Sequence, residues 1–138
     1  MSKLSDQLRI HEGVRKHVYL CSAGYETIGV GRNIAESGLG LSDDENDYLL
    51  ENDIQRCYRE LLVFPWFIDL EPVRQDAMVN LCFNLGITTL KKFSNALASM
   101  EAGAYSDAAE HFLDSRWASQ VGNRAQEVAH MIRTAEYP

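Results

Sequence analysis

The chain has 138 residues, of which 46% are hydrophobic and 24% are charged, and its formal net charge is −7 at pH 7. This length suits one domain with a proper core, and the composition is ordinary for a soluble globular protein. The acidic charge argues against nucleic acid as a partner, because proteins that bind phosphate backbones need a basic surface.

The cysteines and the hydrophobic runs exclude further classes. Cys21, Cys57 and Cys82 are odd in number and show no CxxC or Cys/His spacing, so we expect free thiols, with neither a disulfide framework nor a zinc site. No stretch approaches the roughly 18 apolar residues that cross a membrane, and the N-terminus lacks an apolar run of signal-peptide length. We therefore expect a protein that is made in a cytoplasm and does not insert stably into a membrane.

The first predicted element is a helix that ends at Gly13. Leu4, Leu8 and His11 recur at helical spacing, and glycine commonly ends a helix in a left-handed conformation. Glu12 therefore falls in the last turn, where the partial negative charge of the helix end makes a carboxylate unfavourable by a few tenths to about 1 kcal/mol. A carboxylate at this unfavourable position therefore needs a structural or functional explanation.

A glycine-punctuated β-hairpin is predicted next. Residues 18–20 and 25–30 have the pattern of two strands, and residues 22–24 that of the turn between them. Thr27 falls on the same face of the second strand as two glycines, so we expect an open surface beside it. Cys21 comes directly before the turn.

Acidic residues gather after the hairpin. A loop is expected over 33–41, and Ser42 begins a capping-box pattern for a long helix at about 43–61. The plain interpretation of the acidic cluster is a solvated helix face, and the alternative is a surface for a cation or a partner. Its members are Glu36, Asp43, Asp44, Glu45, Asp47, Glu51 and Asp53.

The rest of the chain is predicted to be helical. A helix from Pro72 to Gly86 is apolar over much of its circumference, which predicts a buried central helix. Three shorter helices are expected, with N-caps at Ser94, at Ser106 and at a residue near Asn123.

The predicted fold class is α+β, mostly α, in a single domain over 1–138. We expect a small β-containing lobe at about 13–41, and a helical part formed by the N-terminal helix and 42–138. A cleft is expected between the hairpin and the helices.

The spacing of three residues carries a resemblance to a known family. Glu12 is followed after eight residues by Cys21, and Cys21 after five residues by Thr27. This pattern resembles the catalytic segment of the phage-type lysozymes, glycoside hydrolase family 24, in which the middle position is Asp or less often Cys. The flanking residues are similar to the T-even phage members of the family: Leu8, Arg9, Ile10, Gly13, Tyr19, Gly24, Tyr25, Ile28, Gly29 and Gly31.

Later segments extend the resemblance over nearly the whole chain. The residues Ser115, Arg116, Trp117, Gln120, Asn123, Arg124 and Ala125 are similar to the family's C-terminal motif. Between the two motifs, Val73, Asn80, Phe83, Gly86, Phe93 and Asn95 follow the family's order. The lysozyme-like fold that this implies has two lobes around a buried central helix.

The resemblance implies a muramidase that hydrolyses the β-1,4 bond between N-acetylmuramic acid and N-acetylglucosamine. It implies Glu12 as the general acid, Cys21 and Thr27 on the opposite face of the sugar, and Arg124 as the cation that faces Glu12. For the acid role we expect the helix end and the apolar hairpin to supply a negative field and partial burial.

Three residues are expected to line the sugar cleft, namely Asn80, Phe83 and Asn95. Phe83 fits the core equally well, whereas Trp117 fits packing under the C-terminal helices better than a sugar platform.

The chemistry of Cys21 leaves two mechanisms open. Attack by a thiolate would retain the anomeric configuration, whereas a water held between Cys21 and Thr27 would invert it. Thr27, as a residue that can hold a water, favours the inverting arrangement.

Two other function classes remain alternatives. A lysozyme-fold module that binds glycan or a partner without catalysis is one, because Cys21 stands where the common form of the family has Asp. A Cys/His peptidoglycan peptidase or amidase is the other, since His11 and His17 are close in sequence to Cys21.

The resemblance also sets the expected partners and location. We expect bacterial cell-wall peptidoglycan as the substrate, a monomer, and no cofactor or metal. A phage or prophage endolysin without a signal peptide would accumulate in the host cytoplasm and reach the wall through a separate pore.

Overall fold

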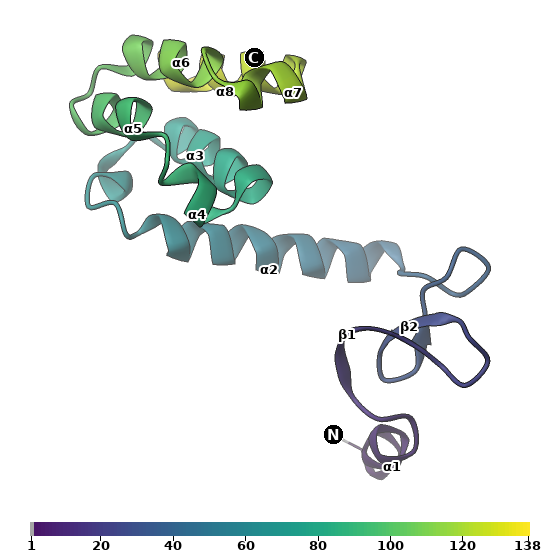
Figure 1. The fold of residues 1–138 in the computed structure, drawn as a ribbon. Coiled ribbons are helices and arrows are strands. Elements are labelled where there is room, and N and C mark those ends of the chain that lie inside the picture. The colour runs from purple at the N-terminus through teal and green to yellow at the C-terminus, as the bar shows by residue number, and fades with distance from the viewer. Residues whose placement is uncertain (1) are drawn as a thin grey trace. The chain divides into compact units, whose positions relative to one another are not determined.

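The computed structural model describes residues 2–138 and is mostly helical, with one small antiparallel sheet (Figure 1). This agrees with the predicted α+β class. The chain forms two units, one that extends to Leu49 and one from Leu50 to Pro138, and the boundary between them falls inside a helix. The single domain expected from the sequence stays a prediction.

Unit 1 begins with α1 (Lys3–Glu12), both ends of which are fixed by local hydrogen bonds. The Ser2 side chain accepts a hydrogen bond from the Ser5 N–H and begins the helix. Gly13 ends it with a φ of 76° and an N–H that donates to Arg9 O at 2.9 Å. The end of this helix at Glu12 is therefore confirmed.

The sheet of unit 1 has the order β1-β2-β3, with β1 at Arg15–Leu20, β2 at Glu26–Gly29 and β3 at Arg32–Asn33. In the register of the sheet, Thr27 lies opposite Tyr19 on one side and Asn33 on the other. The hairpin was predicted, but β3 was not, and its second residue, Asn33, falls in the stretch 33–41 that was expected to be a loop. A strand of two residues is too short to show alternation in the sequence.

Helix α2 (Asp43–Leu61) begins with the predicted capping box. The Ser42 N–H donates to Glu45 Oε1 at 3.0 Å, and the Glu45 N–H donates to Ser42 Oγ at 3.3 Å. Two residues near the end of α2, Cys57 and Leu61, are buried.

The central helix of unit 2 is α3 (Pro72–Leu85). It begins at Pro72 and ends before Gly86, as predicted. The α3 residues Ala77, Met78 and Leu81 are each 0% exposed, so the prediction of a buried central helix is confirmed. The other elements of the unit are η1 (Phe67–Asp69), α4 (Ile87–Leu90), α5 (Ser94–Glu101), α6 (Tyr105–Leu113), α7 (Arg116–Val121) and α8 (Asn123–Thr134). Helix α6 packs against α5 and α8, and α8 also packs against α3 (Figure 1).

The N-caps of α5 and α6 differ from those expected, whereas α8 has its N-cap at Gly122, next to the expected position near Asn123. Ser94 and Ser106 lie inside α5 and α6, whose N-caps are Phe93 and Ala104 without a side-chain hydrogen bond. Ser115, in contrast, caps α7 by accepting from the Ala118 N–H. The starts of α5 and α6 depend on the burial of their apolar residues in the core, and no side-chain cap sets them.

Trp117 of α7 is 5% exposed, and its Nε1–H donates to Asn84 Oδ1 at 2.6 Å, so its packing role is confirmed.

Among the described residues, no helix is both long enough and apolar enough to span a membrane.

Candidate functional site

Glu12, the predicted acid, lies at the C-terminal end of α1 with its carboxylate over Gly31. A Cβ placed on Gly31 would stand 2.8 Å from Glu12 Oε2, and the φ of Gly31 is +67°. Glycine at position 31 therefore gives the carboxylate its space and adopts a backbone conformation that other residues rarely take. The Glu12 side chain is exposed, and none of the α1 residues is buried, so the partial burial expected for Glu12 is absent.

Cys21, the second predicted residue, lies at the tight turn between β1 and β2. The Cys21 N–H donates to Tyr25 O at 3.0 Å, and the Gly24 N–H donates to Cys21 O at 2.8 Å, which closes the turn. The backbone N–H groups of Tyr25 first, and of Ala23 and Gly24, hydrogen-bond the sulfur and lower the pKa of the Cys21 thiol. This partly exposed thiol has the surroundings of a reactive cysteine.

Thr27 lies on β2 close to Cys21, and its hydroxyl lowers the pKa of Cys21 when it donates its hydrogen to the sulfur. Thr27 Oγ1 donates to Tyr25 O at 2.8 Å. The side chain is 3% exposed, so the open surface expected beside Thr27 is absent. The structure thus brings Cys21 and Thr27 together and places all three residues of the spacing pattern in unit 1.

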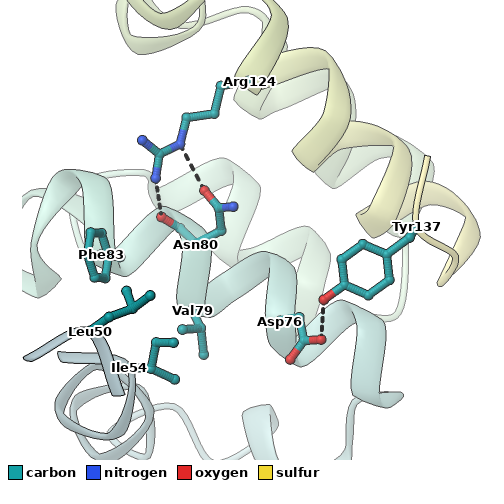
Figure 2. A pocket seen from close by; sticks show the side chains of 8 residues that line it. All are labelled: Leu50, Ile54, Asp76, Val79, Asn80, Phe83, Arg124 and Tyr137. Atoms are coloured by element: carbon teal, nitrogen blue, oxygen red, sulfur yellow. Dashed lines mark hydrogen bonds between the residues drawn. The ribbon is translucent and has the colours of Figure 1, made fainter. Parts of the chain in front are cut away.

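Unit 2 contains an open pocket of about 430 Å³ that collects three of the predicted residues (Figure 2). Asn80 and Phe83 come from α3, and Arg124 comes from the first turn of α8. Phe83 is 43% exposed, which places it on the surface of the pocket and outside the core. The remaining lining residues are Leu50, Ile54, Asp76, Val79 and Tyr137.

Hydrogen bonds fix the polar side of this pocket. Arg124 Nε donates to Asn80 Oδ1 at 2.9 Å, and a second guanidinium nitrogen donates to Asn80 O at 3.4 Å. The Tyr137 hydroxyl donates to the Asp76 carboxylate, and this bond raises the pKa of Tyr137 (Figure 2). The pocket therefore offers an apolar wall, a cation and an amide that is already oriented.

Asn95 lies apart from the other residues predicted to bind sugar. It lines a second depression of unit 2, together with Lys92, His111 and Asp114. The predicted pairing of Arg124 with Glu12 joins residues of different units and stays a prediction.

Sequence reasoning missed two groups at these sites. The amide N–H groups around the Cys21 sulfur belong to the backbone, so only the turn signal of residues 22–24 hinted at them. Asp76 and Tyr137 come from distant segments, and no spacing rule connects them.

Comparison with known proteins gives a consistent set of relatives. The phage lysozyme family model matches residues 9–135. The chain is 25% identical to "Probable T4-type lysozyme 1" of Dictyostelium discoideum, over 97% of this chain and 95% of that protein. It is 29% identical to "Endolysin" of Acyrthosiphon pisum secondary endosymbiont phage 1, over 85% of this chain and 80% of that protein. It is also 28% identical to the pre-baseplate central spike protein Gp5 of Enterobacteria phage T4, over 95% of this chain but 28% of that protein.

Proposed function

Because the chain belongs to the phage lysozyme family of lysozyme-type hydrolases, we propose that it cleaves the β-1,4 bond between N-acetylmuramic acid and N-acetylglucosamine in peptidoglycan. Glu12 protonates the leaving glycosidic oxygen, while Cys21 and Thr27 act on the opposite face of the sugar ring. Arg124 supports Glu12.

The surroundings of Cys21 are the observation that most supports this proposal. A cysteine that only fills space is buried among apolar groups, which raise its pKa. Cys21 is instead partly exposed, and three amide N–H groups and the Thr27 hydroxyl lower its pKa. Such a group is suited to accept a proton from water or to attack carbon.

Two routes use these residues. In the inverting route, Cys21 accepts a proton from a water that Thr27 helps to hold, and this water attacks the anomeric carbon as Glu12 protonates the leaving oxygen. In the retaining route, the Cys21 thiolate attacks the anomeric carbon as the glycosidic bond breaks and Glu12 protonates the leaving oxygen. Water, which gives a proton to Glu12, then displaces the thiolate from the thioglycosyl intermediate. We favour the inverting route because Thr27 offers a hydroxyl beside the sulfur.

The pocket of unit 2 is proposed to bind part of the glycan. Phe83 offers an exposed ring against which a sugar face can pack, and Asn80 and Arg124 offer hydrogen bonds to sugar hydroxyls or carboxylates. Asn95 is proposed to contact a more distant part of the strand.

Purified protein on purified peptidoglycan, with the masses of the products measured, tests the proposal. Cut glycan strands support a muramidase, cut peptide stems support the Cys/His enzyme, and unaltered material supports a binding module. Identification of the first-formed anomer by NMR then separates the routes, since a β product requires attack by sulfur and an α product requires attack by water.

The Glu12→Gln variant identifies the acid. Loss of a general acid typically lowers the rate by about 100- to 10,000-fold, so glycan cleavage should almost disappear while the fold stays intact. Glu36→Gln, which changes an exposed loop carboxylate of the same unit, is the matched control and should keep its activity. More than half of the original activity in Glu12→Gln would rule out this role.

The biological role proposed is that of a phage or prophage endolysin that lyses its host. In this proposal the protein accumulates in the cytoplasm and reaches the wall through a separate membrane pore. Expression in a bacterium with and without a co-expressed pore protein tests it. Lysis only with the pore supports the proposal, and rapid lysis without a pore contradicts it.

A further inference from the structure

Two cysteines from different helices meet inside unit 2. Cys57 lies on α2 and Cys82 lies on α3, and they are 1% and 2% exposed. Glu60, one turn after Cys57 on α2, brings a carboxylate to the same place. One ligand atom from each residue, two sulfurs and one oxygen, lies within 4.8 Å of the other two.

These donor atoms are those that zinc and similar ions prefer. Zn²⁺ binds thiolate sulfur at about 2.3 Å and carboxylate oxygen at about 2.0–2.2 Å, so the ligand atoms of a tetrahedral site lie about 3.5–4 Å apart. The three side chains therefore need only small movements to reach one ion. Soft thiolate ligands also select against Mg²⁺ and Ca²⁺.

We propose that Cys57, Glu60 and Cys82 bind one thiophilic divalent cation of the zinc class, with water as the fourth ligand. The burial of the residues suits such a site. The two sulfurs are enclosed by the core, whereas the Glu60 side chain is 37% exposed. Glu60 can therefore take the ion from solvent and pass it inward to the thiols.

Binding has to displace two protons, one from each thiol, since metal ligands are thiolates. Burial, together with the neighbouring Cys57 and Glu60, raises the pKa of Cys82 to about 12. The charge of a divalent cation offsets the two thiolate charges.

Arg56 competes with a cation for the carboxylate of Glu60. Arg56 Nε is 3.6 Å from Glu60 Oε1, and Arg56 NH1 is 2.9 Å from Asp53 Oδ1. The guanidinium holds the carboxylate that would have to turn toward the ion. Arg56→Gln should therefore strengthen cation binding.

Cadmium titration tests the proposal, because the thiolate–cadmium bond absorbs in the ultraviolet. The full chain, reduced and kept free of oxygen, is titrated with Cd²⁺ in the Cys21→Ala background, so that only the two buried thiols can bind. We expect one Cd²⁺ per chain, displacement by Zn²⁺, and a higher Tm with either ion.

Matched variants on α2 and α3 assign the ligands. Cys82→Ala should abolish the cadmium absorption, and Glu60→Gln should weaken binding by at least about tenfold. Glu51→Gln removes an exposed carboxylate of the same helix and should leave the affinity unchanged.

Several outcomes would overturn the proposal. One is reduced protein that shows no thiolate–cadmium absorption. Another is a Cys57–Cys82 disulfide that forms readily while the reduced thiols bind no ion. If Cys82→Ala fails to fold, Glu60→Gln and Arg56→Gln still test the proposal. Both substitutions change partly exposed side chains of α2 and should leave the fold intact. Equal affinity in these two variants and in the parent chain contradicts a site that includes Glu60.

Discussion

The carboxylate of Glu12 lies against Gly31, so closely that a single methyl group at position 31 would stand 2.8 Å from Glu12 Oε2. The contact joins the end of α1 to the connection between β2 and β3. The position of the proposed acid therefore depends on a residue that has no side chain.

Gly31→Ala should lower glycan cleavage much more than it lowers stability. The new Cβ displaces the Glu12 carboxylate, and the positive φ of 67° adds strain of about 1–2 kcal/mol. Gly29→Ala is the control, because Gly29 has a φ of 69° but open space where a Cβ would be. Both variants should lose similar free energy of unfolding, measured by urea titration. Equal activities in the two variants would show that the Glu12–Gly31 contact is unimportant.

Cys21 should react with alkylating reagents far faster than the other two cysteines. The turn amides lower the pKa of its thiol, so its alkylation rate should rise with pH around a midpoint below that of an ordinary cysteine. Cys57 and Cys82 are enclosed by the core and should stay unmodified in the folded protein. Peptide masses after a timed reaction with iodoacetamide measure all three.

Substitutions at Cys21 should follow the same chemistry. Alkylation or Cys21→Ala should remove most of the activity, whereas Cys21→Asp should keep it with an optimum at lower pH, since a carboxylate ionises at lower pH than a thiol. The pH profile of glycan cleavage is the measurement. Full activity in Cys21→Ala would mean that the thiol only packs.

Acid should weaken unit 1 through the Arg32–Glu45 ion pair. Arg32 NH1 lies 2.7 Å from Glu45 Oε1, and this bond, with those from Ser42, lowers the pKa of Glu45 to about 2. A carboxyl whose pKa is lower in the folded protein adds stability above its unfolded value and loses that stability as the pH falls. The free energy of unfolding should therefore fall between about pH 4.5 and pH 2, and Glu45→Gln should flatten this slope. Glu36→Gln should leave it unchanged.

Arg74 should be the most important charged residue for the stability of unit 2. Its side chain is 10% exposed, its Nε–H donates to Ile132 O at 2.6 Å, and its guanidinium lies 3.7 Å from the Tyr105 ring centroid. Arg74→Met should cost about 2–4 kcal/mol of unfolding free energy, because it leaves carbonyls at the end of α8 without their donor. Arg133→Met, which breaks an exposed ion pair with Glu110, should cost less than about 1 kcal/mol.

Local signals in the sequence predicted the element ends that depend on local chemistry. Gly13, Ser42, Pro72 and Gly86 act through their own φ angles or hydrogen bonds, and each marks a helix boundary in the structure. The starts of α5 and α6 depend on core packing, which is why the nearby serines misled the prediction.

The candidate site was predictable as a set of positions but not as a set of contacts. The spacing of Glu12, Cys21 and Thr27 came from one short segment. The burial of Thr27 and the space over Gly31 depend on the folded sheet. The meeting of Cys57 with Cys82 needs two helices to pack, and no periodicity within one helix reveals it.

The Thr27 hydroxyl has a single hydrogen but two neighbours that can accept it, Tyr25 O and the Cys21 sulfur. When Cys21 is a thiol, the hydroxyl can donate to the carbonyl while its lone pairs face the S–H group. When Cys21 becomes a thiolate, rotation about one bond turns the same hydrogen toward the sulfur. Valine has the shape of threonine but a methyl group in place of the hydroxyl. A Thr27→Val variant would therefore have no hydrogen to turn toward the sulfur when Cys21 loses its proton.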